Sequence, residues 1–285
     1  MIHELPLERR TLHGHFSREL EPIAVVDPGD SMAFSCPNAA WDLASGEPFE
    51  PRDAELDAGH ALIGPVEVRG AKADGTLTVT IDEVGPAGWG VTFGHELRLD
   101  WQLADGVGRD EKGRIVQLSP FLGVLGMPPP EPGRHSTGPP RRFGGNIDCK
   151  ELVAGTTLFL PIPVDGALFS AGDGHAAQGD GELSGTAIEC PVARAVLTLD
   201  LREELELRSP VARVDGAWLA FGFDEDLDLA AEQAAATILD LMERELGIDR
   251  NYALGLASVA VDLRVTQIVN GVKGVHAVLR DGAIR

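Results

Sequence analysis

The sequence predicts a mainly β protein, with a β-sandwich or distorted-barrel body at residues 1–202 and a smaller α+β part at residues 203–285. Three observations lead to this fold class. Glycine numbers 34 and proline 19 in 285 residues, which favours many turns over a helical bundle. Short apolar or alternating runs dominate the first two thirds of the chain. A long helical period occurs once, in the last third.

Short strands are expected throughout the body. Thr76–Ile81 alternates most clearly, with Leu77, Val79 and Ile81 on one face and threonines on the other. The other expected strands are Ile23–Val26, Val66–Arg69, Thr156–Leu160, Ala187–Ile188 and Ala195–Leu201. Because glycine and proline turns separate these runs, a sandwich or distorted barrel is the natural architecture.

A long segment without periodicity, Met127–Gly145, interrupts the strands. It is rich in proline, glycine and arginine. Loops of this length and composition are often functional. A flexible surface loop is the alternative interpretation.

The C-terminal part begins with one strong helix. Its apolar stripe steps by three and four residues through Leu227, Ala231, Ala234, Ile238 and Leu241. Nearby aspartates favour its N-terminus, and Gly247 is placed to end it. Val259–Val269 then alternates, and a turn at Asn270-Gly271 predicts a hairpin with Val275–Leu279.

Charge and cysteine content exclude several classes of protein. Acidic residues number 45 against 24 basic ones, a net charge of −21, so nucleic acids and anionic membranes are not expected partners. A neutral or cationic substrate is easier to accommodate. The odd set Cys36, Cys149 and Cys190 fits a reducing compartment. The first ten residues lack the apolar run of a signal peptide, and no stretch approaches a membrane span, so we expect a soluble cytoplasmic protein.

The segment Gly172–Glu182 carries the strongest functional signal. It combines four glycines with Asp173, His175, Asp180 and Glu182. These side chains are ligands for divalent cations and can also carry protons. The glycines permit positive φ and close approach to a small ligand. A polar, helix-hostile run of this kind suits a site better than a core.

Three polar pairs share a spacing of two residues, which places side chains on one face of an extended strand. The pairs are Asn146 with Asp148, Asp173 with His175, and Asp180 with Glu182. If these segments converge, their side chains suit Zn²⁺, or Mg²⁺, Mn²⁺ or Ca²⁺ where oxygen ligands dominate. The alternative is that these polar residues lie in ordinary turns and form no site.

Other candidates are weaker. His13 and His15 are interpreted as surface histidines, with substrate contact as the alternative, and His276 as a hydrogen-bonded residue of the last strand. Cys149-Lys150-Glu151 contains the residue types of a Cys/Lys/Glu amidase, but adjacent side chains of an extended chain point apart. The sequence contains no Gly-x-Ser-x-Gly, phosphate-loop or dinucleotide-binding motif.

Taken together, these segments resemble the acetamidase/formamidase family. The matching motifs are Pro28-Gly29-Asp30, Gly64–Ala71, Gly123–Gly126, Gly144–Asp148, Gly166–Ser170, Gly172–Glu182 and Gly185–Glu189. The resemblance runs over nearly the whole chain and implies a mainly β body with a smaller α+β part. It further implies hydrolysis of short linear amides to ammonia and carboxylate with a divalent metal, and a homodimer or larger assembly. Ile147, Cys149 and the surroundings of His13 depart from the family's pattern, which leaves the substrate pocket open.

The match falls on Asn146, Asp148, Asp173, His175, Gln178 and Glu182. The hypothesis is that Asp148, Asp173 and His175 bind the metal, with Zn²⁺ expected ahead of Ca²⁺, Mg²⁺ or Mn²⁺. Glu182 then acts as general base and Asn146 or Gln178 orients the amide. His13 and Asp180 are expected to contact substrate, although either Asp180 or Glu182 can face the cavity. Two alternatives stay open: another metal-assisted reaction on a small carbonyl compound, and a non-catalytic cation-binding β protein.

Overall fold

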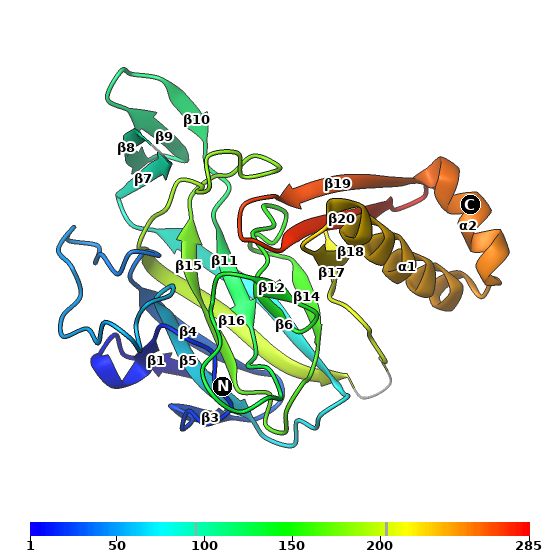
Figure 1. Ribbon diagram of the computed structural model, residues 1–285, viewed down its shortest axis with the longest axis horizontal. Helices are drawn as coiled ribbons and strands as arrows, with labels where there is room; N and C mark the ends of the chain where they lie inside the picture. Colours follow the sequence, from blue (N-terminus) through cyan, green and yellow to red (C-terminus); the bar gives the residue numbers. More distant parts are fainter. Residues whose placement is uncertain (95, 203–204) are drawn as a thin grey trace.

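Two large β-sheets form most of the molecule, and a computed structural model describes them over residues 1–94, 96–202 and 205–285. A unit of two helices and the last strands lies at one end (Figure 1). The mainly β fold class with a C-terminal α+β part is thereby confirmed. The sheets are open, so the architecture follows the sandwich alternative and not a closed barrel.

The larger sheet has nine strands, and it continues from the body into the C-terminal unit. In spatial order they are β1 (Ile2–Leu5), β4 (Asp30–Cys36), β16 (Val192–Arg202), β6 (Thr76–Pro86), β14 (Thr157–Pro161), β17 (Val211–Val214), β18 (Ala217–Asp224), β20 (Lys273–Arg280) and β19 (Val261–Gln267). The join is the antiparallel pairing of β14 with β17. The division expected between residues 202 and 203 stays a prediction, because residues 203 and 204 lie outside the described ranges.

The second sheet carries the glycine-rich strands. Its order is β12 (Pro140–Arg141), β13 (Gly144–Asn146), β11 (Phe121–Gly126), β15 (Phe169–His175), β5 (Leu62–Val68) and β2 (Leu12–His13), with β3 (Ala24–Val26) also paired to β5. A short 3-10 helix, η1 (Arg9–Thr11), precedes β2. A separate four-stranded sheet projects from the body (Figure 1). It contains β7 (Trp89–Gly94), β8 (Leu97–Ala104), β9 (Val107–Asp110) and β10 (Ile115–Gln117).

The main core lies between the two large sheets. Leu77, Val79 and Ile81 of β6 are fully buried in it, as the alternation predicts. Leu122 of β11 and Phe169 of β15 join the same cluster from the second sheet. Each strand therefore contributes apolar side chains to a shared interior, which fixes the positions of the strands that carry polar residues.

Most expected strands are confirmed, but one is wrong. Ala187–Ile188 is irregular backbone, and the neighbouring Glu189 makes only isolated bridges with Val91 and His175. The segment is too short and too close to glycine turns to form a ladder. Met127–Gly145 is largely irregular, as expected, apart from β12 and the start of β13.

The predicted helix is confirmed as α1 (Leu227–Leu246). Asp226 caps its N-terminus by accepting from the backbone of Asp228 and Leu229, and Gly247 ends it with a left-handed φ of 64°. A second helix, α2 (Arg250–Ala260), was not expected. Ala253 is its one buried residue among those described, and the apolar residues Tyr252, Leu254 and Val259 are exposed, so its apolar residues are not confined to the side that packs. None of the described helices is long and apolar enough to cross a membrane.

Helix α1 packs directly on β18 through a glycine. A Cβ atom added at Gly222 would lie 2.1 Å from the Ala230 carbonyl oxygen and 2.4 Å from the Ala234 nitrogen. Ala230 and Ala234 are fully buried against the sheet. The close approach of helix and strand therefore requires a residue without a side chain at position 222.

We expect Gly222→Ala to lower the free energy of unfolding by about 1–3 kcal/mol, because the methyl group must push α1 away from β18. Thermal melting measures the change. Gly255→Ala in the exposed part of α2 is the matched control, since its Cβ would meet nothing within 4 Å; that change should be neutral or stabilising. Equal losses in both variants would contradict the packing explanation.

His13 on β2 is buried, contrary to the interpretation of it as a surface histidine. Its Nδ1 donates to the His15 carbonyl at 2.7 Å, and its Nε2 accepts from Ser170 Oγ at 2.9 Å. Burial lowers the pKa of His13 to about 4, although the hydrogen bond with His15 opposes this shift. The ring is therefore neutral in the folded protein at pH 7.

Because the pKa of His13 is lower in the folded than in the unfolded chain, the unfolded state binds more protons below pH 6.5. Stability should therefore fall as the pH decreases from about 6.5 to 4, by up to roughly 3 kcal/mol for this group. In His13→Gln this contribution is absent, so the free energy of unfolding should depend less steeply on pH over that range. Urea titrations at pH 7 and pH 5 measure how much the free energy of unfolding changes in wild type and in His13→Gln. Equal changes in the two proteins would contradict the lowered pKa of His13.

Candidate active site

A cavity of about 500 Å³ brings together polar residues from distant parts of the chain. Its polar and charged lining consists of Arg52, His60, Asn146, Asp148, Asp173, His175, Glu182, Thr186, Glu189 and Asn270. Strand β15 supplies Asp173 and His175, two residues apart, and Asn146 ends β13. Asn270 comes from the turn between β19 and β20, so both parts of the chain contribute to the cavity.

The floor of the cavity requires a glycine. Gly123 on β11 lies between Leu122 and Val124, which pair with Gly174 and Gly172 of β15. A Cβ atom at Gly123 would lie 2.5 Å from Asp173 Oδ2, 2.7 Å from Asp148 Oδ1 and 2.9 Å from His175 Cε1. Any side chain there would occupy the space in which these three groups meet.

Three carboxylates of the cavity stand on left-handed backbone. The φ angles of Asp148, Asp173 and Glu182 are 52°, 63° and 48°. Such angles are uncommon for residues with side chains and are strained, and they gather at functional sites. The cavity therefore keeps three of its acids on a backbone conformation that costs energy.

The orientation of His175 follows from Gln178. The Gln178 amide Nε2 donates to the backbone carbonyl of Asp148 at 2.7 Å, so its Oε1 accepts from His175 Nδ1 at 3.0 Å. With Nδ1 engaged in this way, Nε2 is the nitrogen that carries the lone pair whenever the ring is neutral. That nitrogen lies 3.4 Å from Asp173 Oδ1 and 3.3 Å from Glu189 Oε2.

Several buried carboxylate oxygens have no hydrogen-bond partner among the described residues. They are Asp148 Oδ1, Asp173 Oδ1, Glu182 Oε2 and Glu189 Oε2. The other Asp148 oxygen accepts from Asn270 Nδ2 at 2.6 Å. Four enclosed acids against His175 and the more distant His60 leave an excess of negative charge. Buried charges of this kind require a cation or bound protons.

The pKa values reflect the same excess. Burial raises the pKa of Glu182 to about 7, and burial together with the charge of Glu182 raises the pKa of Asp148 well above its usual range. Burial alone would lower the pKa of His175, but Glu189 and Asp173 outweigh this effect and raise it. Burial would raise the pKa of Asp173, yet the charges of His175 and His60 lower it. The number of carboxylates therefore exceeds the positive charge that His175 and His60 can supply.

The donor set fits a divalent cation. Asp173, His175 and Glu189 present ligand atoms within 4.8 Å of one another, as do Asp148, His175 and Glu182. Because Gln178 occupies His175 Nδ1, the Nε2 side with Asp173 and Glu189 is the more favourable of the two groups. Carboxylate oxygens with one imidazole nitrogen suit Zn²⁺ and Mn²⁺, and oxygens alone suit Ca²⁺ and Mg²⁺.

The structure brings together five of the residues predicted from sequence: Asn146, Asp148, Asp173, His175 and Glu182. Gln178 lies behind the cavity and holds His175. Asp180 pairs with Lys150 and Arg264 and is not among the residues lining the cavity, so Glu182 faces it instead. His13 is likewise absent from the lining.

The sequence analysis did not predict five polar residues of the lining: Arg52, His60, Thr186, Glu189 and Asn270. Glu189 closes a motif used for the family resemblance, Gly185–Glu189, which was the available signal for it. Asn270 was assigned only to a hairpin turn, and His60 has no neighbouring pattern. A two-residue strand period therefore does not predict the lining residues that lie on loops and turns.

Cys149 has lost support as a nucleophile. Its side chain is fully buried, and burial together with Glu151 raises the pKa of the thiol well above its usual range. The reactive form of cysteine is the thiolate, which this environment disfavours. Lys150 pairs with Asp180 at 3.0 Å, whereas Cys149 Sγ contacts Glu151.

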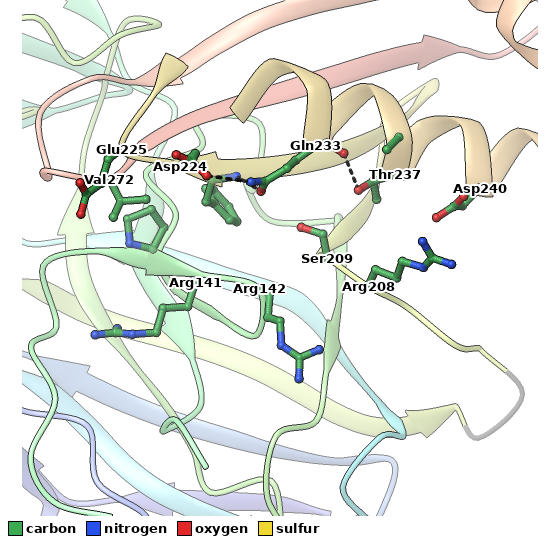
Figure 2. Close-up of a pocket in the computed structure, with 13 residues that line it drawn as sticks. Arg141, Arg142, Arg208, Ser209, Asp224, Glu225, Gln233, Thr237, Asp240 and Val272 are labelled. Atoms are coloured by element: carbon green, nitrogen blue, oxygen red, sulfur yellow. Dashed lines mark hydrogen bonds between the residues drawn. The ribbon is translucent and has the colours of Figure 1, made fainter. Parts of the chain in front are cut away.

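A larger cavity, about 660 Å³, lies between the body and α1 (Figure 2). Arg141, Arg142, Arg208, Asp224 and Asp240 are among its lining residues. The side chains of Arg141 and Arg142 extend away from α1, and Arg208 lies beside Asp240 (Figure 2). Asp224 accepts a hydrogen bond from Gln233 of α1. None of the described clusters of possible metal ligands falls within this lining. Of these two cavities, the chemistry favours the smaller one.

Comparison with known proteins supports the resemblance seen in the sequence. The model of the Acetamidase/Formamidase family matches residues 132–279, which is more than half of the chain. The chain is 24% identical to an acetamidase of Mycolicibacterium smegmatis, over 60% of this chain and 61% of that protein. It is 25% identical to a formamidase of Methylophilus methylotrophus, over 61% of this chain and 60% of that protein. The chain thus spans about three fifths of the length of these curated relatives.

The fold agrees over a greater length. The crystal structure of an acetamidase from Bacillus halodurans superimposes with a TM-score of 0.85 at 27% identity, covering 97% of each chain. The family match includes β15, the loop to Glu189 and the β19–β20 turn, which carry most of the cavity's polar lining. The chain belongs to the acetamidase/formamidase family.

Proposed function

We propose that this protein hydrolyses short linear amides, of the formamide or acetamide type, to ammonia and a carboxylate with the help of a divalent metal. The observation that carries the proposal is the position of His175 Nε2 between Asp173 and Glu189, whose facing oxygens have no hydrogen-bond partner among the described residues. Family membership supports the reaction class.

The choice of substrate rests on two arguments. The matched relatives are named acetamidase and formamidase. A cavity of about 500 Å³ with an acidic lining favours a small neutral molecule over an anion. Ile147 is fully buried, so its departure from the family's pattern does not act at the cavity surface.

We assign Asp173, His175 and Glu189 as metal ligands on the Nε2 side, because Glu189 Oε2 lies as close to His175 Nε2 as the nearest Asp173 oxygen does. Asp148 is proposed as a further ligand through its unpartnered Oδ1, which lies 3.9 Å from His175 Nδ1. A divalent cation at this position, with Zn²⁺ expected before Ca²⁺, Mg²⁺ or Mn²⁺, would polarise the amide carbonyl and acidify a water molecule. Gln178 keeps the imidazole in the tautomer that leaves Nε2 free.

Glu182 is assigned as general base. It is largely buried, and its pKa of about 7 is suited to exchanging protons near neutral pH. Its carboxylate takes the proton of the attacking water and delivers it to the departing nitrogen. Asn146 orients the amide, since its buried Oδ1 has no hydrogen-bond partner among the described residues and can accept from an N–H group.

Two further properties belong to the proposal. The three cysteines are free and buried, which supports the expected reducing, cytoplasmic location. The expected homodimer or larger assembly is supported by the family resemblance alone, and sedimentation of the purified protein would test it.

Glu182→Gln keeps the size of the side chain and removes its proton exchange. We expect kcat for ammonia release from formamide or acetamide to fall about 10²–10⁴-fold, with bound metal retained. Glu232→Gln, on the exposed face of α1, is the matched control and should leave kcat unchanged. Unchanged turnover in Glu182→Gln would remove Glu182 from the role of base.

Exhaustive chelation of the wild-type protein tests whether ammonia release depends on a bound metal. Ammonia release should cease and return when Zn²⁺ or Mn²⁺ is restored. Full activity without metal would overturn the metal assignment. A melting temperature that depends on metal, with no turnover of either amide, would instead favour the non-catalytic cation-binding protein.

Gly123→Ala tests the crowded floor of the cavity. The added methyl group would lie within 3 Å of Asp173, Asp148 and His175, so these groups must move apart. We expect a loss of metal affinity and of ammonia release, each by at least about tenfold, as for other displacements of metal ligands. Gly179→Ala is the control, because its Cβ would meet nothing within 4 Å. Normal metal binding in Gly123→Ala would contradict the geometry.

A further inference from the structure

A second cluster of possible metal ligands lies outside the cavity. Cys149 and Glu151 come from the loop after β13, and His276 comes from the middle of β20. Their ligand atoms lie within 4.8 Å of one another. Cys149 Sγ is 3.3 Å from Glu151 Oε2, and His276 Nε2 is 3.8 Å from the same oxygen. Sulfur, nitrogen and oxygen donors thus converge on one point.

The His276 ring is arranged as a ligand. It is fully buried, and its Nδ1 bonds Thr266 Oγ1 of the adjacent strand β19 at 2.8 Å. Its Nε2 has no hydrogen-bond partner among the described residues and is directed at Glu151. Histidines that bind metals are usually oriented in this way, through a hydrogen bond from the second ring nitrogen. A structural histidine would be expected to use both nitrogens.

We propose that Cys149, Glu151 and His276 form a Zn²⁺ site that ties the C-terminal hairpin to the body. Binding replaces the thiol proton of Cys149 by a sulfur–zinc bond and releases that proton to solvent. The imidazole Nε2 and Glu151 Oε2 complete three protein ligands. A thiolate donor selects Zn²⁺ over Mg²⁺ and Ca²⁺, which prefer oxygen.

The surrounding charges are compatible with this ion. The Cys149 thiolate and the Glu151 carboxylate together balance its two positive charges. Glu151 binds through Oε2 while Oε1 stays on Arg264 Nη1 at 2.6 Å, and Arg264 also pairs with Asp180. The side chain of Glu151 is 19% exposed, so solvent has access for entry of the ion and for a fourth ligand.

The position of the site gives it a structural role. Cys149 follows Asp148 directly, and Asn270 in the β19–β20 turn bonds Asp148. A zinc ion between Cys149 and β20 would therefore fix the hairpin that holds an active-site carboxylate.

Substitution of Co²⁺ for Zn²⁺ tests the proposal, because a cobalt–thiolate bond absorbs in the near ultraviolet and an oxygen–imidazole site does not. Full-length protein titrated with CoCl₂ should develop this band, and Cys149→Ser should lose it together with one equivalent of bound metal. Cys190→Ser and Cys36→Ser, which remove the other buried thiols, should retain the band.

His175→Ala tests the second metal site independently of the proposed function, because it disrupts the active-site ligands and leaves Cys149, Glu151 and His276 intact. The cobalt band should persist in that variant. Thr266→Val, which removes the hydrogen bond to His276, should weaken Zn²⁺ binding at this site about 10- to 100-fold. Circular dichroism checks that each variant is folded.

Two outcomes would overturn the proposal: a wild-type protein without the thiolate band, or a folded Cys149→Ser that binds metal with the same stoichiometry and spectrum as wild type. Loss of the band in Cys190→Ser with retention in Cys149→Ser would place the sulfur ligand elsewhere and would equally refute it. None of these results depends on whether the protein hydrolyses amides.

Discussion

Repulsion among enclosed carboxylates is the constraint on which the active-site region depends. Asp148, Asp173, Glu182 and Glu189 surround one imidazole, and each leaves a buried oxygen without a hydrogen-bond partner among the described residues. Asn270 holds Asp148 and Gln178 holds His175 through hydrogen bonds, and the backbone contributes the rest. Left-handed φ angles position Asp148, Asp173 and Glu182, and Gly123 leaves the space in which Asp148, Asp173 and His175 meet. The apolar core between the two sheets offsets the cost of this strain.

The continuous nine-stranded sheet explains how the C-terminal part takes part in this arrangement. Pairing of β14 with β17 carries the sheet into the last strands, and the β19–β20 hairpin then reaches back toward the body (Figure 1). Its turn delivers Asn270 to Asp148, and Gln267 bridges Gly181 beside Glu182. The helices therefore support the site indirectly, by packing on the strands that end in this hairpin.

Sequence periodicity predicted the parts of the site that lie on regular structure. Asp173 and His175 share a face because they are two residues apart on β15, and Leu77, Val79 and Ile81 are buried for the same reason. Glu182 and Asp180 have the same spacing but lie in a turn, where side-chain direction depends on φ values that no local pattern encodes. Glu189, His60 and Asn270 reach the cavity through tertiary folding, which a short stretch of sequence does not predict.

The loop after β13 shows how neighbouring residues can serve different purposes. Asp148 faces the oxygen-rich cavity, whereas Cys149 and Glu151 contact each other and His276 on another side, and Lys150 turns to Asp180. Adjacent side chains that point apart exclude a catalytic Cys/Lys/Glu set at these positions. The same divergence allows one short loop to present hard oxygen ligands to one centre and a soft sulfur ligand to another. A loop that is held on both sides has little freedom to shift, which is the property that a strained Asp148 requires.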